Sequence, residues 1–499
     1  MISWRDRDEE VHHGSLFAAF AALSRGEAWS FPALRPHQRE PWHAFTVQVA
    51  ALALIRAGLD ALPTDEVAWR DLLLALTPDH PSGEAWELVV DDWTKPALLQ
   101  PPIVAADNRG DHKSRLPTPD ALDMLVTAKN HDVKQERIAD AVDEDWLFAL
   151  LTLQTTEGFL GAGNYGISRM NGGFASRMSL GLRPTGGGAA GAFRRDVRRL
   201  IANAASRPDR RGGIPLLWTE PWDGTRSLDF TKLDELYVEV CRRVRLVRGA
   251  GGVEALAAGS KCARVAASEL KGRTADPWAP LKADGSTSVT PTGGGFGYRA
   301  FTRLLRTGET SLPLLARVHD EDDREGLAIV AAALVRGQGK TEGLHRRAVR
   351  TSRMVEIEEY VEEALDRIGE VASRRALDAS EAGRRLRRAL ILLVQGGPDQ
   401  ARLDDDAAGR KVDPWMRQYD ALVDRYFFDG GLWAEAAGKA AAPRKEWRER
   451  LRASASEVLG QAAESAPRTE MRRIRAVARS RSMLDAQMNK WFKEVADGE

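Results

Sequence analysis

The stretch Met354-Val-Glu-Ile-Glu-Glu-Tyr-Val-Glu-Glu-Ala-Leu365 repeats its apolar residues every three or four positions, which is the spacing of an amphipathic helix. Glycine and proline breakers separate later copies of this pattern. The copies lie at 380–394, 414–428, 445–464 and 467–496. The sequence therefore predicts a bundle of about four antiparallel helices over residues 352–499.

The first 351 residues have a different texture, in which helical patterns alternate with short apolar runs. Patterns that predict helices lie at His43–Arg56, Trp69–Leu76 and Asp143–Thr152. Shorter runs bounded by glycine and proline predict strands at Ile214–Trp218 and Leu236–Val240. We therefore expect an α+β fold, in which a large mixed N-terminal domain precedes the C-terminal four-helix bundle.

Long loops rich in glycine and basic residues interrupt the N-terminal domain, which we place at residues 1–351. They are predicted at 161–188, 205–213, 271–299 and 336–343. Within the first, Met170–Gly188 combines glycines, two arginines, hydroxyls and an amide, without a catalytic acid or base. Glycine lets the backbone approach another molecule closely, and exposed N–H groups and arginines suit a polyanion. A phosphate-binding surface and a flexible loop without a function both agree with this composition.

The composition limits the class of protein. Of the 499 residues, 43% are apolar and 29% are charged, which is typical of a folded globular protein. Basic and acidic residues number 72 each, so a polyanion must bind a local basic patch. Cys241 and Cys262 are too few for a disulfide framework or a zinc knuckle. Because the N-terminus is charged and no apolar run could span a bilayer, we expect a cytoplasmic protein. We also expect that it binds no metal and no cofactor.

Motifs that would indicate an enzyme are incomplete. Gly337-Gln-Gly-Lys-Thr341 resembles the end of a phosphate-binding P-loop, but Leu334 stands where the motif requires its first glycine. No serine, histidine and acid grouping has a recognisable setting. No standard metal spacing joins the N-terminal histidines His12, His13, His37 and His43. We therefore expect a protein that is not an enzyme, with a nucleotide-binding enzyme that uses Gly337–Thr341 as the alternative.

A dense basic cluster follows the small-residue turn at 337–339. Its members are Arg336, Lys340, His345, Arg346, Arg347 and Arg350. Helical spacing from Gly343 onward would place three of these arginines on neighbouring turns, where they could contact successive phosphates. A solvated helix face is the alternative interpretation of the same charges.

Four segments resemble the signatures of a known family. They are Phe31-Pro-Ala-Leu-Arg-Pro-His-Gln-Arg-Glu-Pro-Trp-His-Ala-Phe45, Leu98-Leu-Gln-Pro-Pro-Ile103, Leu125-Val-Thr-Ala-Lys-Asn-His-Asp132 and Leu217-Trp-Thr-Glu-Pro-Trp-Asp-Gly-Thr225. In this order, with the terminal helical pattern, the chain resembles the CasA family, the large subunit of the type I-E CRISPR surveillance complex, Cascade. The resemblance runs over essentially the whole chain.

The resemblance implies a non-catalytic subunit of an RNA-guided complex for antiviral defence. In the family, this subunit recognises the protospacer-adjacent motif (PAM) of double-stranded DNA through the minor groove. It wedges the strands apart so that an R-loop can start, and it helps to recruit a helicase–nuclease. The implied partners are the other Cascade subunits, the CRISPR RNA and the target DNA. A scaffold that only braces other subunits is a further alternative.

The resemblance also assigns roles to single residues. A glycine loop falls on Asn171, Gly172 and Gly173, and a lysine finger on Lys282, with Lys271 as a competitor. Because the minor groove presents a degenerate code, such a set would read a motif loosely.

Two further assignments follow from the resemblance. A glutamine wedge falls on Gln338, among the DNA-binding candidates Arg336, Lys340, Arg346 and Arg347. A loop that contacts the guide RNA end and neighbouring subunits falls on Lys129, Asn130, His131 and Lys134.

Overall fold

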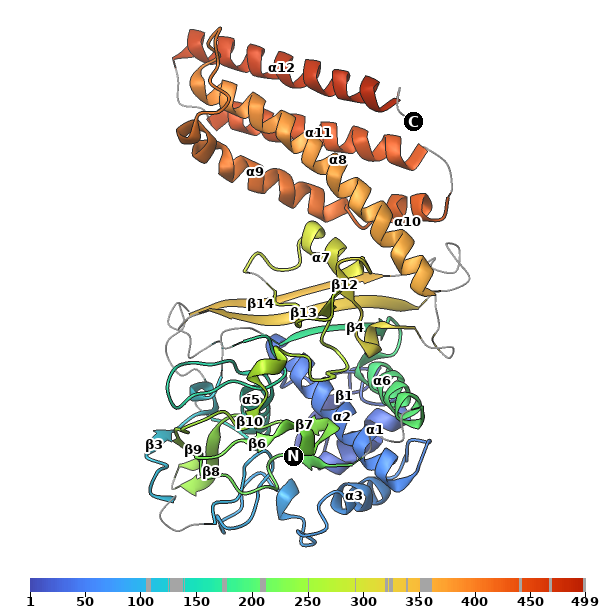
Figure 1. Ribbon diagram of the computed structural model, residues 1–499, viewed down its shortest axis with the longest axis vertical. Helices are drawn as coiled ribbons and strands as arrows, with labels where there is room; N and C mark the ends of the chain where they lie inside the picture. Colours follow the sequence, from blue (N-terminus) through green and yellow to red (C-terminus); the bar gives the residue numbers. More distant parts are fainter. Residues whose placement is uncertain are drawn as a thin grey trace. The chain divides into compact units, whose positions relative to one another are not determined.

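The structure, a computed structural model, divides into two compact units (Figure 1). The first comprises Met1–Phe296 with Thr307–Ser352, and the second comprises Gly297–Arg306 with Arg353–Glu499. The residues that the structure describes are 1–104, 109–123, 125, 138, 140–172, 177–206, 212–249, 251–291, 293–318, 322, 326–337, 340–350, 361–438, 442–465 and 469–496.

Helix α2 (Arg39–Ala57) forms the centre of the first unit and confirms the helix predicted at His43–Arg56. Apolar residues occupy nearly all of its faces, so it is buried along most of its length. Helices α3, α5 and α6 pack against it. The helices around α2 are α1 (Leu16–Arg25), α3 (Glu66–Ala75), α5 (Asp143–Thr156) and α6 (Gly188–Ala205), of which α3 and α5 were also predicted.

A three-stranded antiparallel sheet carries many of the candidate site residues. Its order is β14-β13-β4, with β4 at Met178–Pro184, β13 at Leu327–Gly337 and β14 at Lys340–Arg350 (Figure 1). The central strand β13 is buried on both faces, because residues 327–335 are all apolar.

Three of the predicted loops are wrong in part. The loop predicted at 271–299 contains the two-residue strand β11 (Leu281–Lys282) and the start of helix α7 (Tyr298–Leu305). The loop predicted at 161–188 contains β4, in which Met178, Leu180 and Leu182 alternate as buried residues along the pleat. The loop predicted at 336–343 contains the paired ends of β13 and β14. In these two stretches the glycines obscure the alternation and the strand pairing that form the sheet.

The other strands of the first unit are short. Strands β5 (Ile214–Leu216) and β7 (Leu233–Val238) pair in parallel and confirm the two predicted strands. Further strands are β1 (Ile2–Arg5), β2 (Val11–Gly14), β3 (Ser114–Leu116), β6 (Leu228–Asp229), β8 (Arg243–Gly249), β9 (Gly252–Ala258), β10 (Val265–Ala266), β11 (Leu281–Lys282) and β12 (Thr310–Ser311).

The second unit is helical and confirms both the predicted C-terminal bundle and the α+β class. Residues 354–360, which begin the helical pattern predicted at Met354–Leu365, lie outside the described residues. Among the helices that the structure describes, none has the length and apolar character needed to cross a bilayer. The helices are α8 (Val361–Gln395), α9 (Asp406–Tyr426), α10 (Gly430–Ala436), α11 (Ala442–Ser465) and α12 (Glu470–Ala496).

A short helix from the middle of the chain belongs to this second unit. Helix α7 (Tyr298–Leu305) packs against α8. The backbone N–H of Tyr298 donates to Asp424 Oδ1 at 2.6 Å, and its ring centroid lies 4.6 Å from that of Phe427. The apolar core of the second unit therefore includes Tyr298, which the sequence analysis assigned to a loop of the N-terminal domain.

Candidate nucleic-acid interface

The predicted glycine loop begins at a fixed point of the first unit. Asn171 Nδ2 donates to the carbonyl of Ser288 at 3.3 Å. Gly172 has a φ of +83°, and a β-carbon built there would meet nothing within 4 Å. Gly172 is exposed, so its backbone is open to close approach by another molecule. Gly173 lies outside the described residues.

The segment from Lys271 to Ser288 holds both ends of this loop. Gly272 has a φ of +80°, and a β-carbon there would lie 2.2 Å from Ser288 Oγ and 3.0 Å from the carbonyl carbon of Met170. At the other end, Arg177 Nε donates to Asp276 Oδ2 at 2.7 Å. The loop is therefore anchored just before Asn171 and again at residue 177, and its first anchor requires glycine at position 272.

Both candidate lysines lie beside Ser288. The backbone N–H of Ser288 donates to the carbonyl of Lys271 at 3.0 Å, and Leu281 forms a β-bridge with Ser288. Lys282 follows in β11, and its backbone N–H donates to Thr287 at 3.0 Å. Both lysine side chains are exposed. The structure thus brings the start of the glycine loop together with two exposed cations, and it leaves the choice between Lys271 and Lys282 open.

The hairpin of β13 and β14 carries the predicted wedge. Its last paired residues are Gly337 and Lys340, next to the pair of Arg336 and Thr341. Gln338 and Gly339 lie outside the described residues, as do the side chains of Arg336 and Lys340. The alternative of a nucleotide-binding enzyme is not supported by this hairpin. A P-loop needs a helix after the glycines, to bind phosphate at its N-terminus, whereas Lys340 begins a strand here.

The basic residues after the hairpin turn lie on a strand, so the helical spacing predicted from Gly343 onward is wrong. Arg346 pairs with Ala332 and Arg347 with Ala331. Because successive side chains of a strand point to opposite faces, these two arginines cannot contact one track of phosphates together. Arg346 is about half exposed, whereas Arg347 Nη1 donates to the carbonyl of Phe296 at 3.0 Å.

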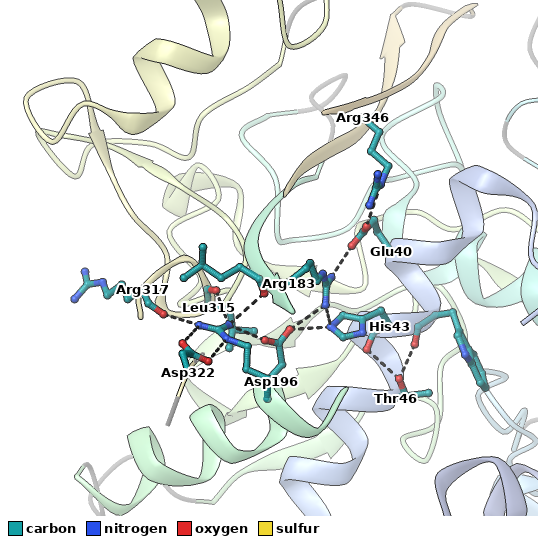
Figure 2. A network of polar contacts seen from close by, with 12 residues as sticks. Glu40, His43, Thr46, Arg183, Asp196, Leu315, Arg317, Asp322 and Arg346 are labelled. Atoms are coloured by element: carbon teal, nitrogen blue, oxygen red, sulfur yellow. Dashed lines mark hydrogen bonds and ion pairs between the residues drawn. The ribbon is translucent and has the colours of Figure 1, made fainter. Parts of the chain in front are cut away.

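Arg346 is the outermost member of a chain of polar contacts that leads into the buried part of the first unit (Figure 2). Its Nε lies 3.8 Å from Glu40 Oε1, and Glu40 Oε2 accepts from Arg183 Nη2 at 2.7 Å. Arg183 Nη1 donates to Asp196 Oδ2 at 3.1 Å, and His43 Nε2 lies 2.8 Å from the same oxygen. These contacts join β14, α2, β4 and α6, so the hairpin rests on the buried centre of the first unit.

The pKa shifts in this network follow from burial and neighbouring charge. Burial alone would raise the pKa of Glu40 and of Asp196. The arginine charges around both carboxylates, together with the hydrogen bond between His43 and Asp196, outweigh burial and hold both pKa values below their usual range. Burial, together with the charge of Arg183, lowers the pKa of His43. The two carboxylates are therefore ionised at neutral pH, while His43 is neutral.

A second ionic cluster lies where the predicted RNA-contacting loop begins and ends. Asp123 Oδ1 accepts the backbone N–H of Leu125 at 2.8 Å, and Asp120 Oδ2 accepts that of Ile138 at 3.1 Å. Arg35 bridges the two carboxylates. The contact candidates between these ends, Lys129, Asn130, His131 and Lys134, lie outside the described residues.

Among the residues that the structure describes, one group of side chains combines metal-ligand types within reach of one another. Ligand atoms of Asp6, Glu10 and His12 lie within 4.8 Å of each other at the surface. Their contacts close a tight turn: the backbone N–H of Glu10 donates to Asp6 Oδ1 at 3.0 Å, and His12 Nε2 lies 2.8 Å from Asp6 Oδ2. Cys241 and Cys262 are free thiols.

In the first unit, the exposed Gly172, the two exposed lysines and the basic hairpin are suited to binding a polyanion. The second unit is a helical bundle. No protein-family model and no curated protein sequence matches this chain. CasA from Thermus thermophilus has a similar structure, with a TM-score of 0.64 over 98% of both chains at 17% identity. Cse1 from Thermobifida fusca has a TM-score of 0.60 over 98% of this chain and 96% of its own at 15% identity.

A third neighbour, the CRISPR-associated protein Cse1 from Acidimicrobium ferrooxidans, has a TM-score of 0.59 over 98% of this chain and 97% of its own at 14% identity. The chain therefore has the CasA/Cse1 fold from end to end. This finding confirms the resemblance inferred from the sequence signatures.

Proposed function

We propose that this chain is the large subunit of a type I-E Cascade complex, which recognises a PAM in double-stranded DNA and opens the duplex beside it. The observation that carries the proposal is the meeting of Asn171 and Gly172 with two exposed lysines around Ser288. An exposed glycine backbone and a single cation suit the minor groove, whose floor presents few distinguishing groups. The likeness to CasA and Cse1 over nearly whole chains supports the same role.

Strand opening is assigned to the tip of the β13–β14 hairpin. In this proposal Gln338 enters a base step, at an unstacking cost of a few kcal/mol that contacts to the opened strands offset. A long hairpin is suited to this task because β13 is buried on both faces and Arg346 ties β14 to Glu40. The guide RNA then supplies most of the sequence specificity through base pairing.

The proposal has no catalytic step. Guide RNA, the other Cascade subunits and target DNA are the proposed partners, with a helicase–nuclease recruited after the R-loop forms. The complex is proposed to work in the cytoplasm, and no cofactor is required for binding or wedging.

Permanganate footprinting of a target duplex, in an assembled complex with a matched guide, tests the proposal. We expect reactive thymines beside a good motif with the native chain, and few when the chain is omitted. Gln338→Ala should reduce this reactivity more than it reduces initial DNA binding. Equal reactivity with and without the chain would contradict the proposed role, and unchanged reactivity in the variant would contradict the wedge.

A further inference from the structure

A cavity of about 370 Å³ lies in the first unit. None of its lining residues is among the proposed DNA contacts. Its volume falls within the range of small-molecule sites. Three parts of the chain contribute to it: the end of the signature segment at 98–103, the Pro-Trp-Asp stretch at 221–223 of a second signature segment, and Arg264. The lining residues are Pro102, Ile103, Val104, Pro221, Trp222, Asp223, Thr225, Arg226, Ser227, Leu228 and Arg264.

Backbone hydrogen bonds hold the walls of this cavity together. The N–H of Trp222 donates to the carbonyl of Pro102 at 3.3 Å, and the N–H of Leu228 donates to the carbonyl of Arg264 at 2.7 Å. Ser227 Oγ donates to the carbonyl of Ala263 at 2.6 Å. The cavity is therefore formed by connected backbone segments, which favours a preformed site.

Arg264 places a buried positive charge in the wall. It is 2% exposed, and its guanidinium lies 5.2 Å from the centroid of the Trp222 ring. Its Nη atoms donate to three backbone carbonyls, and among the described residues no carboxylate lies within ion-pair distance of it. Burial lowers the pKa of Arg264 to about 10. The carboxylates of Glu220 and Asp223 stabilise this charge only from beyond ion-pair distance, so an anion bound beside Arg264 would stabilise it further.

The rim of the cavity adds three features of different chemistry. Arg226 is exposed and contributes a second cation. Val104 is 65% exposed and, with the two prolines, forms an apolar wall. Hydrogen bonds from the backbone and side chain of Thr225 hold the pKa of Asp223 below its usual range, so this carboxylate accepts hydrogen bonds at neutral pH.

We propose that this cavity binds one nucleotide, with its base against Val104 and the prolines and its phosphate toward Arg226 and Arg264. Asp223 would accept a hydrogen bond from an amino group of the base. A lone phosphate would leave the apolar wall unused, and a neutral apolar ligand would leave both cations unused. The site goes beyond the proposed DNA-reading residues, and it does not depend on them.

Calorimetric titration of the full chain alone, with AMP, CMP, GMP and UMP and with inorganic phosphate, tests the site. We expect at least one nucleotide to bind, and phosphate to bind about tenfold more weakly or not at all, since it lacks the apolar contact. Arg226→Ala should weaken nucleotide binding about fivefold, and Val104→Asp should weaken it further. Arg248→Ala, an exposed arginine in β8 outside the cavity lining, should leave binding unchanged.

Circular dichroism of each variant should match the native chain, because Arg226 and Val104 are exposed. Absence of nucleotide binding, or binding that neither variant weakens, overturns the proposal. The titration needs neither guide RNA nor target DNA, so its failure would leave the proposed PAM recognition untouched, and the footprinting result would in turn leave this site untouched.

Discussion

Arg35 and Asp123 form an ion pair, with Nη1 2.9 Å from Oδ2, between two segments that are far apart in the sequence. The carboxylate is 1% exposed, and His37 Nε2 also lies 3.0 Å from the same oxygen. Its other oxygen accepts the backbone N–H of Leu125, so the pair fixes the start of the predicted RNA-contacting segment. Both partners come from segments that carry, or directly precede, the family signatures.

Asp123→Asn should therefore loosen the segment after it and destabilise the first unit by about 2 kcal/mol, since a buried charge pair would lose one partner. Hydrogen–deuterium exchange at Leu125 should accelerate, and urea unfolding measures the stability. Glu27→Gln, which breaks the more exposed pair with Arg25, should cost less than about 1 kcal/mol. Equal effects of the two substitutions would show that burial of the Asp123 pair is not important.

Two glycines with nearly the same backbone conformation give a matched test of the loop anchor. Gly172 (φ +83°) and Gly272 (φ +80°) should both lose about 1 kcal/mol of stability on substitution by alanine, from backbone strain alone. Gly272→Ala should lose more, because its β-carbon would collide with Ser288 and Met170, whereas space at Gly172 is open. Urea unfolding compares the two variants, and equal losses would contradict the anchoring role of Gly272.

The same pair separates stability from DNA recognition. In an assembled complex, Gly172→Ala should weaken binding to duplexes with a good motif, because its β-carbon would enter the space that the groove floor needs. Gel-shift titrations with and without the motif measure this effect. Motif-dependent affinity equal to that of the native complex would remove Gly172 from the proposed interface.

The salt dependence of DNA binding should distinguish the two neighbouring arginines. Arg346 is about half exposed, so Arg346→Ala should reduce the slope of log affinity against log salt by about one. Arg347 is bound to the carbonyl of Phe296, so Arg347→Ala should leave the slope nearly unchanged. A slope reduced equally by both substitutions would contradict the opposite faces that β14 gives them.

The extent to which the sequence predicts the structure depends on how local each signal is. Helix α2 and the bundle helices could be predicted, since a periodic apolar pattern is contained within one element. Strand β14 was predicted as a helix, because Arg346 and Arg347 have no local pattern and their partner β13 decides the conformation. The anchors at Ser288 and Glu40 were missed for the same reason: each joins residues more than a hundred positions from its partner.

Glu239 should make the stability of the first unit fall as pH rises. It is buried, and burial raises its pKa to about 7, although Ser168 donates to it from its backbone and its hydroxyl. Below about pH 4.5, the pKa of this carboxyl in the unfolded chain, Glu239 is protonated in both the folded and the unfolded state, so it does not change the free energy of unfolding. Between that value and about 7 only the unfolded state releases the proton, so stability declines, and above about 7 the loss is constant.

Glu239→Gln removes this titration while keeping the shape of the side chain. Relative to the native chain, the variant should gain about 2–3 kcal/mol of stability between pH 5 and pH 8. Urea unfolding at both pH values measures the gain, with Glu9→Gln, at an exposed position, as a control that should show little change. A native chain and variant with the same pH dependence would place the pKa of Glu239 near its ordinary value.

The bundle should need helix α7 for its full stability, although α7 precedes it by more than fifty residues. Tyr298 packs on Phe427, which is fully buried, and the ring of Phe301 lies 5.3 Å from that of Phe428. A fragment of residues 352–499 would expose these faces and should lose on the order of 3–5 kcal/mol relative to an intact bundle, from two buried aromatic side chains.

A second fragment tests this directly, with residues 297–306 joined to 352–499 through a flexible linker long enough to preserve the packing. Both fragments should give helical circular dichroism spectra, and the longer one should unfold at a higher temperature and more cooperatively. Tyr298→Ala in the longer fragment should remove most of the difference, whereas Arg303→Ala, on the same helix at an exposed position, should remove little. Neither fragment should distinguish DNA motifs, because the glycine loop and the hairpin belong to the first unit. Equal melting temperatures for the two fragments would mean that α7 contributes nothing to the fold of the bundle.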